Sequence, residues 1–442
     1  MNLRKTILIG YALTVALTAS AQNTIENDST EKVENFNFSL EECILYAIEN
    51  SHQRESLRLS EEAARATYRQ SKKNRLPSVS ASAGESASHT GTNSDINFSG
   101  NAGVNASIPI YQGGSIKNTI KQNQLQVEKQ EVQTSQYDDN LTIQILNQYL
   151  NALSCKERLN YQKGIMESSR EQLARGKKRF EVGSIIESDY LLLQAQYESD
   201  KTDSLNTAIS LENALLNLKQ LMSMDPNAIL DVQAPDTTSI DQLALLPSQE
   251  EAVQQAQEHM PDIMLAKSAI EIANTAIDIA KAGKRPQVSA SAGISTRHND
   301  FESVGEQFKN SFSQSIGINI SIPIYDRGSS KLQETRSRIQ QKQAELDLAQ
   351  TKIDIARTVS NQHRSTLLEY QKYLAYQSKK EAYAQSFQAY KKRFEVGSLV
   401  AVELLQQQNN YINVLNEYIN AKYGFILNRK ILDVYTGQNI GL

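Results

Sequence analysis

The sequence predicts a mainly α protomer made of two tandem repeats, with very long coiled-coil helices and four β-strands that form part of a transmembrane β-barrel. Three observations predict this fold class. Ile108–Tyr111 returns as Ile322–Tyr325, and Lys178–Ser184 returns as Lys392–Ser398, both at an offset of 214 residues. Two segments alternate apolar and small polar residues. Two others, of about 64 residues each, contain no proline and scarcely any glycine.

The repeat extends over almost the whole chain. Pro77–Gly84 matches Pro286–Gly293 at an offset of 209 residues, which also aligns Ser39 with Ser248. A five-residue insertion between Gly84 and Gly103 explains the change of offset. Because one insertion confined to a loop leaves the order of elements unchanged, we expect both halves to share one fold.

Residues 1–21 are expected to be a signal peptide. They contain a basic start at Arg4 and Lys5, an apolar run over 7–17 and the small residues Ala19–Ala21. The apolar run is too short for a transmembrane helix. Removing the two basic residues from 46 Lys and Arg leaves 44 against 50 Asp and Glu, a formal net charge of −6. This charge gives no support for nucleic-acid binding.

The rest of the chain is expected to contain five parts in a fixed order. These are an N-terminal segment (22–38), repeat 1 (39–218), a connector or equatorial region (219–247), repeat 2 (248–432) and a C-terminal tail (433–442). Each repeat opens with a short and a long helix, and Ser39 with Glu42 is a capping-box signature for the first of them. Cys43 and Cys155 are expected to be buried structural residues.

A strand pair follows the opening helices of each repeat, at about 78–110 and 287–324. In both pairs Ile, Val and Ala alternate with Ser, Asn and Gly, which gives each strand one apolar and one polar face. Strands of this kind fit a tilted transmembrane β-strand. Unpaired strand edges are not tolerated in hydrocarbon, and a barrel needs about eight strands. Several copies of the chain must therefore share one barrel.

A very long helix then runs from about Ser115 to Lys178, and again from about Ser329 to Lys392. At 1.5 Å per residue each would reach about 95 Å, too long for a compact domain. The first carries two neighbouring apolar stripes, typical of a helix packed between two others in a wall of coiled-coil pairs. One stripe is Ile143, Leu146, Leu150 and Leu153, and the other is Leu141, Ile145 and Tyr149.

These features together resemble the TolC-type outer-membrane efflux proteins over essentially the whole mature chain. The residues that carry the resemblance are Leu40-Glu41-Glu42 with Ala47, both Arg-Phe-Glu-Val-Gly turns, Ser188-Asp189 and Gln194–Tyr197. The resemblance implies a homotrimer with a twelve-stranded barrel in the outer membrane of a Gram-negative bacterium and an α-helical barrel in the periplasm. It also implies a passive export duct for tripartite efflux or type I secretion, docked on a periplasmic adaptor and an inner-membrane pump of the RND or ABC type.

The Val-Gly-Ser turns lie at the end of the long helices furthest from the membrane. On residues alone they are helical hairpin turns, in which glycine releases the backbone. The resemblance adds that this tip contacts the adaptor. The matching positions are Arg179, Val182, Gly183 and Ser184 in repeat 1, and Arg393, Val396, Gly397 and Ser398 in repeat 2.

The resemblance also places a periplasmic gate just past the turns, at Asp189, Glu403 and Phe394. Three copies of Asp189 and Glu403 around a narrow mouth would repel anions and attract cations. The alternative is that both are solvated acids at helix starts, where the helix dipole favours them. Phe394, Leu399 and Gln406 replace a tyrosine, an arginine and an acidic residue of the family pattern, so those groups of its closed-state lock are missing here.

Tyr111 and Tyr325 are expected to end the returning strands in an aromatic girdle on the periplasmic side, where outer-membrane lipid meets water. The loops Glu85–Asp95 and Arg297–Asn310 are expected to face outside, where insertions are tolerated.

No enzyme is expected from this sequence. The five histidines are scattered without metal-site spacing, and no nucleophile-elbow, P-loop or zincin motif occurs, so no catalytic residue, metal or cofactor is predicted. The competing function is a periplasmic coiled-coil scaffold or adaptor that never enters a membrane. It would explain the long helices but not the alternating strands.

Overall fold

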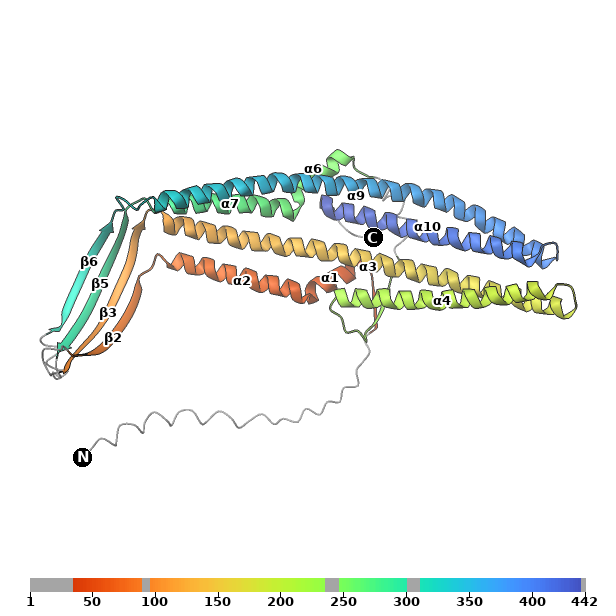
Figure 1. Ribbon diagram of the computed structural model, residues 1–442, viewed down its shortest axis with the longest axis horizontal. Coiled ribbons are helices and arrows are strands. Elements are labelled where there is room, and N and C mark those ends of the chain that lie inside the picture. The colour runs from red at the N-terminus through yellow and green to blue at the C-terminus, as the bar shows by residue number, and fades with distance from the viewer. Residues whose placement is uncertain (1–34, 90–95, 235–245, 300–310, 439–442) are drawn as a thin grey trace, which may run out of the picture.

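The computed structural model describes residues 35–89, 96–234, 246–299 and 311–438. The expected signal peptide lies outside the described residues, as do 90–95 and 300–310 of the expected outer loops and 235–245 of the connector. The protomer is elongated, with four strands at one end and helical hairpins that run to a tip at the other (Figure 1).

The order of elements is the duplicated one that the sequence predicts. Repeat 1 contains α1 (Leu40–Asn50), α2 (His52–Lys73), β2 (Ser78–His89), β3 (Ile96–Gln112), α3 (Ser115–Glu181) and α4 (Glu187–Leu221). Repeat 2 contains α6 (Gln249–His259), α7 (Pro261–Ala282), β5 (Gln287–Asn299), β6 (Ser313–Ser321), α9 (Ser329–Glu395) and α10 (Ala401–Thr436). The two very long helices, α3 and α9, have 67 residues each.

Several boundaries differ from the expected ones. Glu85 lies inside β2, and β5 continues through Asn299, so both strands reach into segments expected to be loops. The C-terminal tail does not begin at 433, because α10 continues to Thr436. Two short strands outside the repeats, β1 (Asn35–Phe38) and β4 (Ile229–Val232), were not predicted, and they pair in parallel.

The helix openings follow the predicted capping chemistry in both repeats. The Ser39 amide donates to Glu42 Oε2 at 2.8 Å, and the Glu42 amide donates to Ser39 Oγ at 3.3 Å. Ser248 and Glu251 repeat this capping box at 3.0 and 3.2 Å. Each box satisfies two amides that the first helical turn leaves without partners.

The four long strands form one antiparallel sheet in the order β2-β3-β5-β6, so β2 and β6 are its open edges. Ala81 faces Val104, which faces Ile294, whereas the next row contains Ser82, Gly103 and Ser295. This register confirms one apolar and one polar face. A bulge between Pro109 and Tyr111 shifts the alternation and brings Tyr111 opposite Val288, in the apolar row.

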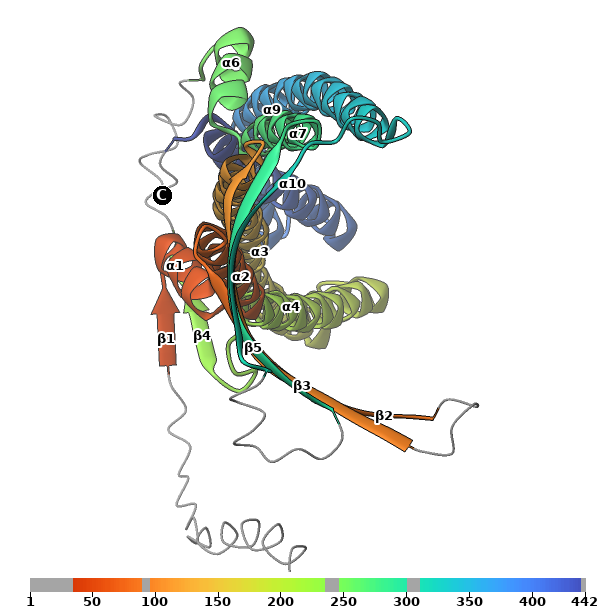
Figure 2. The same ribbon diagram turned by 90° about the vertical axis from the view of Figure 1, so that its left-hand side faces the viewer.

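The helices continue the sheet as a curved wall (Figure 2). Toward the strands the neighbours are α2, α3, α7 and α9, and toward the tip they are α4, α3, α10 and α9. Helix α3 is central and buries both of its predicted apolar stripes, apart from the half-buried Ile143. Helix α9 lies at an edge of the wall and buries far fewer residues.

The largest core lies at the middle of the helical part, beside β1 and β4. The buried Tyr149 hydroxyl is 3.1 Å from the Phe38 carbonyl oxygen and 2.7 Å from that of Gln233, so it ties both short strands to α3. Cys43 lies in this core, where burial raises its pKa to about 12, and Cys155 is also buried. Among the described residues, no helix has the length and apolar character needed to cross a membrane.

Candidate functional site at the helical tip and the sheet end

The two tip turns are the same capping motif. The Ser184 amide donates to the Arg179 carbonyl oxygen at 2.8 Å, and the Gly183 amide donates to that of Phe180 at 2.9 Å. The second turn repeats these bonds with Ser398 and Gly397 at 3.0 and 3.1 Å. Gly183 and Gly397 have φ values of 71° and 81°, the left-handed conformation that this helix ending requires. Each serine hydroxyl also donates to the arginine carbonyl of its own turn.

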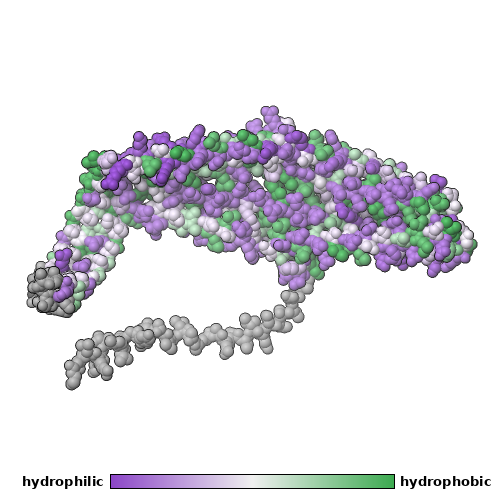
Figure 3. Space-filling model, viewed as in Figure 1, coloured by the Kyte–Doolittle hydropathy of each residue, from purple (hydrophilic) through white to green (hydrophobic). Residues whose placement is uncertain are grey.

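The most exposed large apolar side chains of the tip are two valines. Val182 is 78% exposed and Val396 is 79% exposed. Hydrophobic side chains gather near this end of the molecule among the hydrophilic ones that cover most of the helices (Figure 3). Two exposed apolar side chains on neighbouring turns form a surface suited to binding a partner protein.

The two tip arginines have different surroundings. Arg179 is half-buried: its Nη1 donates to the Phe394 carbonyl oxygen at 3.0 Å, and its guanidinium lies 5.5 Å from the Phe394 ring centroid. Arg393 is exposed and lies 5.7 Å from the ring of Tyr390 on its own helix. Arg175 also pairs with Glu395 between the two hairpins. Arg179 therefore links the two hairpins, and only Arg393 is free toward solvent.

Phe394 lies inside the protomer, not at the surface of a mouth. It is 3% exposed and packs in an apolar cluster of α4, α9 and α10. Leu399, which occupies the place of an arginine in the family pattern, belongs to the same cluster. Phe394 is thus a core residue of the tip in this conformation. The cluster comprises Leu193, Phe387, Phe394, Leu399, Ala401, Leu404 and Leu405.

The two predicted gate acids occupy equivalent places in the first turns of α4 and α10. Asp189 is half-buried and Glu403 is exposed. Both positions are favoured for acids by the helix dipole. Gln406 is exposed and donates to Asn410 one turn further along α10. Within one protomer the structure does not bring Asp189 and Glu403 together.

A buried hydrogen-bond network joins the two hairpins near the apolar cluster that contains Phe394. The Asp200 carboxylate accepts from Gln408 and Gln196, both at 2.8 Å, and from the Ser169 hydroxyl. Gln172 contacts Gln408 at 3.3 Å, and Asp200 is only 1% exposed. Burial raises the pKa of the Asp200 carboxyl, although the hydrogen bonds lower it. This network connects α3 and α4 with α10.

We expect Asp200→Leu to lower the free energy of unfolding by about 2–4 kcal/mol, because it removes the buried carboxylate that accepts hydrogen bonds from Ser169, Gln196 and Gln408. Thermal unfolding of the detergent-solubilised protein would measure the loss. Asp203→Leu, at an exposed position one turn away, should change stability by less than about 0.5 kcal/mol. Equal effects of the two leucine variants would contradict a stabilising network.

The same carboxyl predicts a pH dependence. Because burial raises its pKa in the folded protein, the folded state holds the proton more tightly than the unfolded chain. That stabilisation is complete below the unfolded pKa of about 3.9 and is lost as the pH rises through the raised folded pKa. The unfolding midpoint of the wild type should therefore rise relative to that of Asp200→Asn as the pH falls from 7 toward 4.

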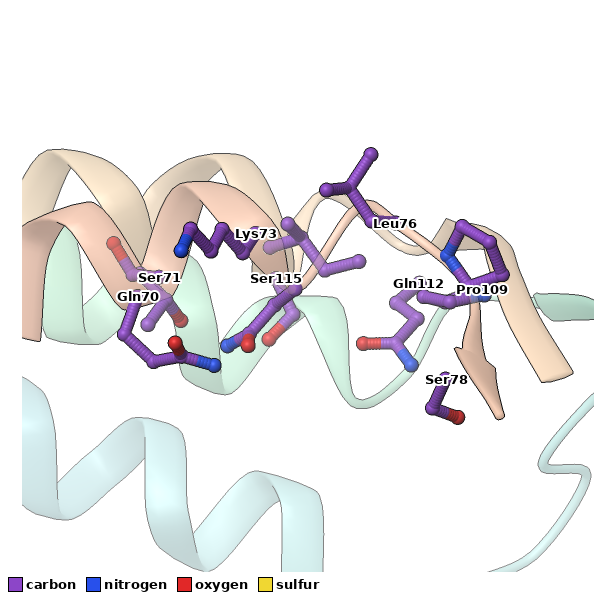
Figure 4. Close-up of a pocket in the computed structure, with 12 residues that line it drawn as sticks. Gln70, Ser71, Lys73, Leu76, Ser78, Pro109, Gln112 and Ser115 are labelled. Carbon is purple, nitrogen blue, oxygen red and sulfur yellow. The ribbon is translucent and has the colours of Figure 1, made fainter. Parts of the chain in front are cut away.

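The opposite end of the molecule has a cavity of about 640 Å³ where the sheet joins the helices. Residues from the ends of α2 and β3 and the starts of β2 and α3 line it, including Gln70, Lys73, Ser78, Gln112 and Ser115 (Figure 4). Tyr111, expected to end its strand, lies inside β3, whereas Tyr325 lies beyond the end of β6 and is 85% exposed.

The wall has unpartnered apolar edges. On α9 one stripe of exposed residues repeats every seven positions: Leu332, Ile339, Leu346, Ile353, Leu367 and Leu374, with Ser360 in the missing place. On α4, at the opposite edge, Leu205, Ile209 and Leu216 are exposed. A seven-residue apolar repeat is typical of a coiled-coil seam, and nothing in the described part of the protomer covers this one.

Sequence reasoning missed Asp200, Arg175 and Leu193 as contributors to the tip. Phe387 and Phe394 are seven residues apart on α9, a spacing that could have indicated an apolar seam. No spacing pattern indicated that Asp200 is buried, because its neighbours in the sequence are polar and charged, which is typical of a solvent-exposed helix face. No group of three or more His, Cys, Asp or Glu able to hold a metal occurs within the described ranges.

Comparison with known proteins gives consistent results. The family model described as "Outer membrane efflux protein" matches residues 44–223 and 252–438. The outer membrane protein TolC of Vibrio cholerae serotype O1 is 25% identical over 303 residues, an alignment that covers 66% of each chain.

Among solved structures, CusC has a TM-score of 0.80 at 20% identity and covers 92% of this chain and 94% of its own. The CmeC outer membrane channel of Campylobacter jejuni has a TM-score of 0.77 at 19% identity, with 92% and 90% covered. The open-state MtrE outer membrane channel of Neisseria gonorrhoeae has a TM-score of 0.74 at 18% identity, with 91% and 89% covered.

Proposed function

Because the chain belongs to the outer membrane efflux protein family, we propose that three copies of it form one continuous export duct. The family is one of transport proteins and not of enzymes, and its members lie in the outer membrane and extend into the periplasm. The predicted fold class, a mainly α tandem-repeat protomer with strands for a β-barrel, is confirmed. The alternative of a scaffold that never enters a membrane is wrong.

The proposal rests on two features of the protomer. The sheet has two open edges, β2 and β6, and the helical wall has exposed apolar residues at its edges, on α9 and α4. Strands β2 and β6 each lack a neighbour on one side, and hydrocarbon does not tolerate such edges. One copy supplies four of the eight or more strands that a barrel needs. The heptad stripe of α9 supplies a coiled-coil seam for the next copy at the same edge. A neighbouring copy can pair with the open strand and cover the exposed helix stripe on the same side of the protomer.

In this assembly the apolar face of the sheet meets outer-membrane lipid, and the Ser, Asn and Gly face lines a water-filled bore. Tyr111, which the bulge turns into the apolar row, takes a place in the periplasmic aromatic girdle. The exposed Val182 and Val396, with the turn serines, Gly183, Gly397 and Arg393, form the docking surface for a periplasmic adaptor. Transport energy comes from an inner-membrane pump of the RND or ABC type.

The assembly is tested by its oligomeric state. Protein extracted from outer membranes should run as heat-modifiable trimers in semi-native electrophoresis and insert as single channels into planar bilayers. A water-soluble monomer as the native form would refute the duct.

The proposed gate predicts a selectivity change. Asp189→Ala combined with Glu403→Ala should shift the reversal potential of single channels under a KCl gradient toward zero, because three copies of each carboxylate leave the mouth. Glu41→Ala with Glu250→Ala is a matched control, because these equivalent acids lie in the first turns of α1 and α6, away from the tip. Unchanged selectivity in the first pair would leave Asp189 and Glu403 as ordinary helix-start acids.

A further inference from the structure

Arg327, in the turn between β6 and α9, has a backbone conformation that residues other than glycine rarely adopt. Its φ is 55°, and Ser223 is the other non-glycine residue with positive φ in the described ranges. This conformation costs about 1 kcal/mol or more. The side chain is exposed and has no hydrogen bond or ion pair with other described residues. Among the described residues, the Arg327 side chain therefore makes no contact that would offset this cost.

The repeat supplies an equivalent junction inside the chain. Gly113, 214 positions before Arg327, has a φ of 62° in the turn between β3 and α3. Arg285, just beyond α7, donates from Nη1 to the Gly113 carbonyl oxygen at 3.0 Å. A Cβ on Gly113 would lie 2.4 Å from the Ala282 carbonyl oxygen. This junction therefore requires glycine on the α3 side and is fastened by an arginine from the α7 side.

In the other pair of equivalent segments, arginine stands on the α9 side and leucine on the α2 side. At the offset of 209, Arg285 corresponds to Leu76, beyond the end of α2. At the offset of 214, Gly113 corresponds to Arg327. Leu76 is 61% exposed and is one of the residues that line the cavity at this junction (Figure 4). Helices α2 and α9 lie at opposite edges of the wall (Figure 1). One protomer therefore cannot form this second junction by itself.

We propose that the Asp326–Arg327 turn of one protomer docks on the end of α2 in the next, which repeats the internal junction between copies. The inference rests on the proposed self-assembly. The Arg327 guanidinium donates to carbonyl oxygens at the C-terminal end of α2, which the helix itself leaves open. The Arg327 side chain keeps this turn further from α2 than Gly113 lies from α7. The Arg327 guanidinium therefore bridges a gap that the close approach of the Gly113 backbone closes in the internal junction.

Charge complementarity supports this partner. The end of α2 is basic, with Lys72, Lys73 and Arg75. Asp326 adds a carboxylate beside Arg327, at the position that Gln112 occupies in the internal junction. The Ser330 and Gly328 amides donate to this carboxylate at 2.8 and 3.0 Å and lower its pKa, so it stays ionised. The turn thus presents an anion to the basic side chains and a cation to the carbonyls.

The same equivalence predicts the register between edge strands of neighbouring copies. Inside the chain Ser107 pairs with Ser291. Shifted by the two offsets, Ser321 of one copy faces Ser82 of the next. A disulfide should therefore link Ser82→Cys with Ser321→Cys across every interface and give covalent trimers on oxidation. Ser82→Cys with Asn319→Cys, displaced by two residues, should link poorly.

Arg327→Gly tests the turn directly. Glycine keeps the backbone conformation and removes the side chain, so the temperature at which trimers dissociate should fall by about 5 °C. Ser223→Gly is the matched control: it relieves the same kind of strain at the end of α4, away from the junction, and should leave that temperature unchanged or slightly higher. Adding Leu76→Arg to Arg327→Gly recreates the Arg285–Gly113 arrangement between copies and should restore the dissociation temperature.

The outcomes separate this inference from the proposed function. The docking of the turn is overturned if Ser82→Cys links to Asn319→Cys and not to Ser321→Cys. It is also overturned if Arg327→Gly raises the dissociation temperature, as a pure relief of strain would predict. The duct itself would survive either result. Absence of wild-type trimers would instead refute the proposed assembly.

Discussion

Leu346→Glu combined with Ile353→Glu should leave the protein monomeric and abolish channel formation. Both residues belong to the seven-residue stripe of α9, which is exposed in the protomer. In the assembly they face the neighbouring copy, so the change buries carboxylates in an apolar seam at every interface, at a cost of several kcal/mol each. Because the protomer does not bury these side chains, its helix content should be unchanged. Light scattering coupled to size-exclusion chromatography would measure the oligomeric state.

Lys352→Glu provides the control for this prediction. Lys352 is an exposed neighbour on α9 that lies off the stripe, so its variant should form trimers as the wild type does. Normal trimers in the double variant would show that the stripe faces solvent and would remove the helical seam from the proposed interface.

The repeat and the two-faced strands could be predicted from the sequence because both are local patterns. Alternation of Ile318 and Ile320 with Ser and Asn survives in the observed register, since a shift by one residue would turn the apolar side chains to the polar face. The bulge at Pro109 broke this alternation at the end of β3 and could not be predicted, because it depends on pairing with β5. Strands β1 and β4 were missed because four residues carry too little periodicity.

The tip was predictable in its backbone but not in its side-chain contacts. Gly183 and Gly397 mark left-handed turns, and glycine is the residue that such helix endings favour. Phe394 was assigned to a gate through the resemblance, yet it packs between hairpins, because Leu399 in place of an arginine makes its surroundings apolar. The contacts of Arg179 and Asp200 join segments far apart in the chain, which spacing along one helix does not reveal.

Gly183→Leu combined with Gly397→Leu should abolish export while trimers persist. Both glycines have positive φ, so leucine strains each turn by about 1–2 kcal/mol and adds bulk to the proposed docking surface. The open sheet edges and the α9 stripe that are proposed to hold the trimer together lie away from these turns, so assembly should survive. Export by the native host strain and the trimer content of its outer membrane would be measured together.

Gly164→Leu is the matched control. Gly164 is an exposed glycine within α3, the helix that precedes the first turn. A Cβ there would meet no atom within 4 Å, and the residue lies remote from the turn. That variant should export normally. If the double tip variant also exports normally, the tip is not the surface that binds the adaptor. If instead its trimers disappear, the glycines serve the folding of the hairpins, and the loss of export follows from the loss of the channel.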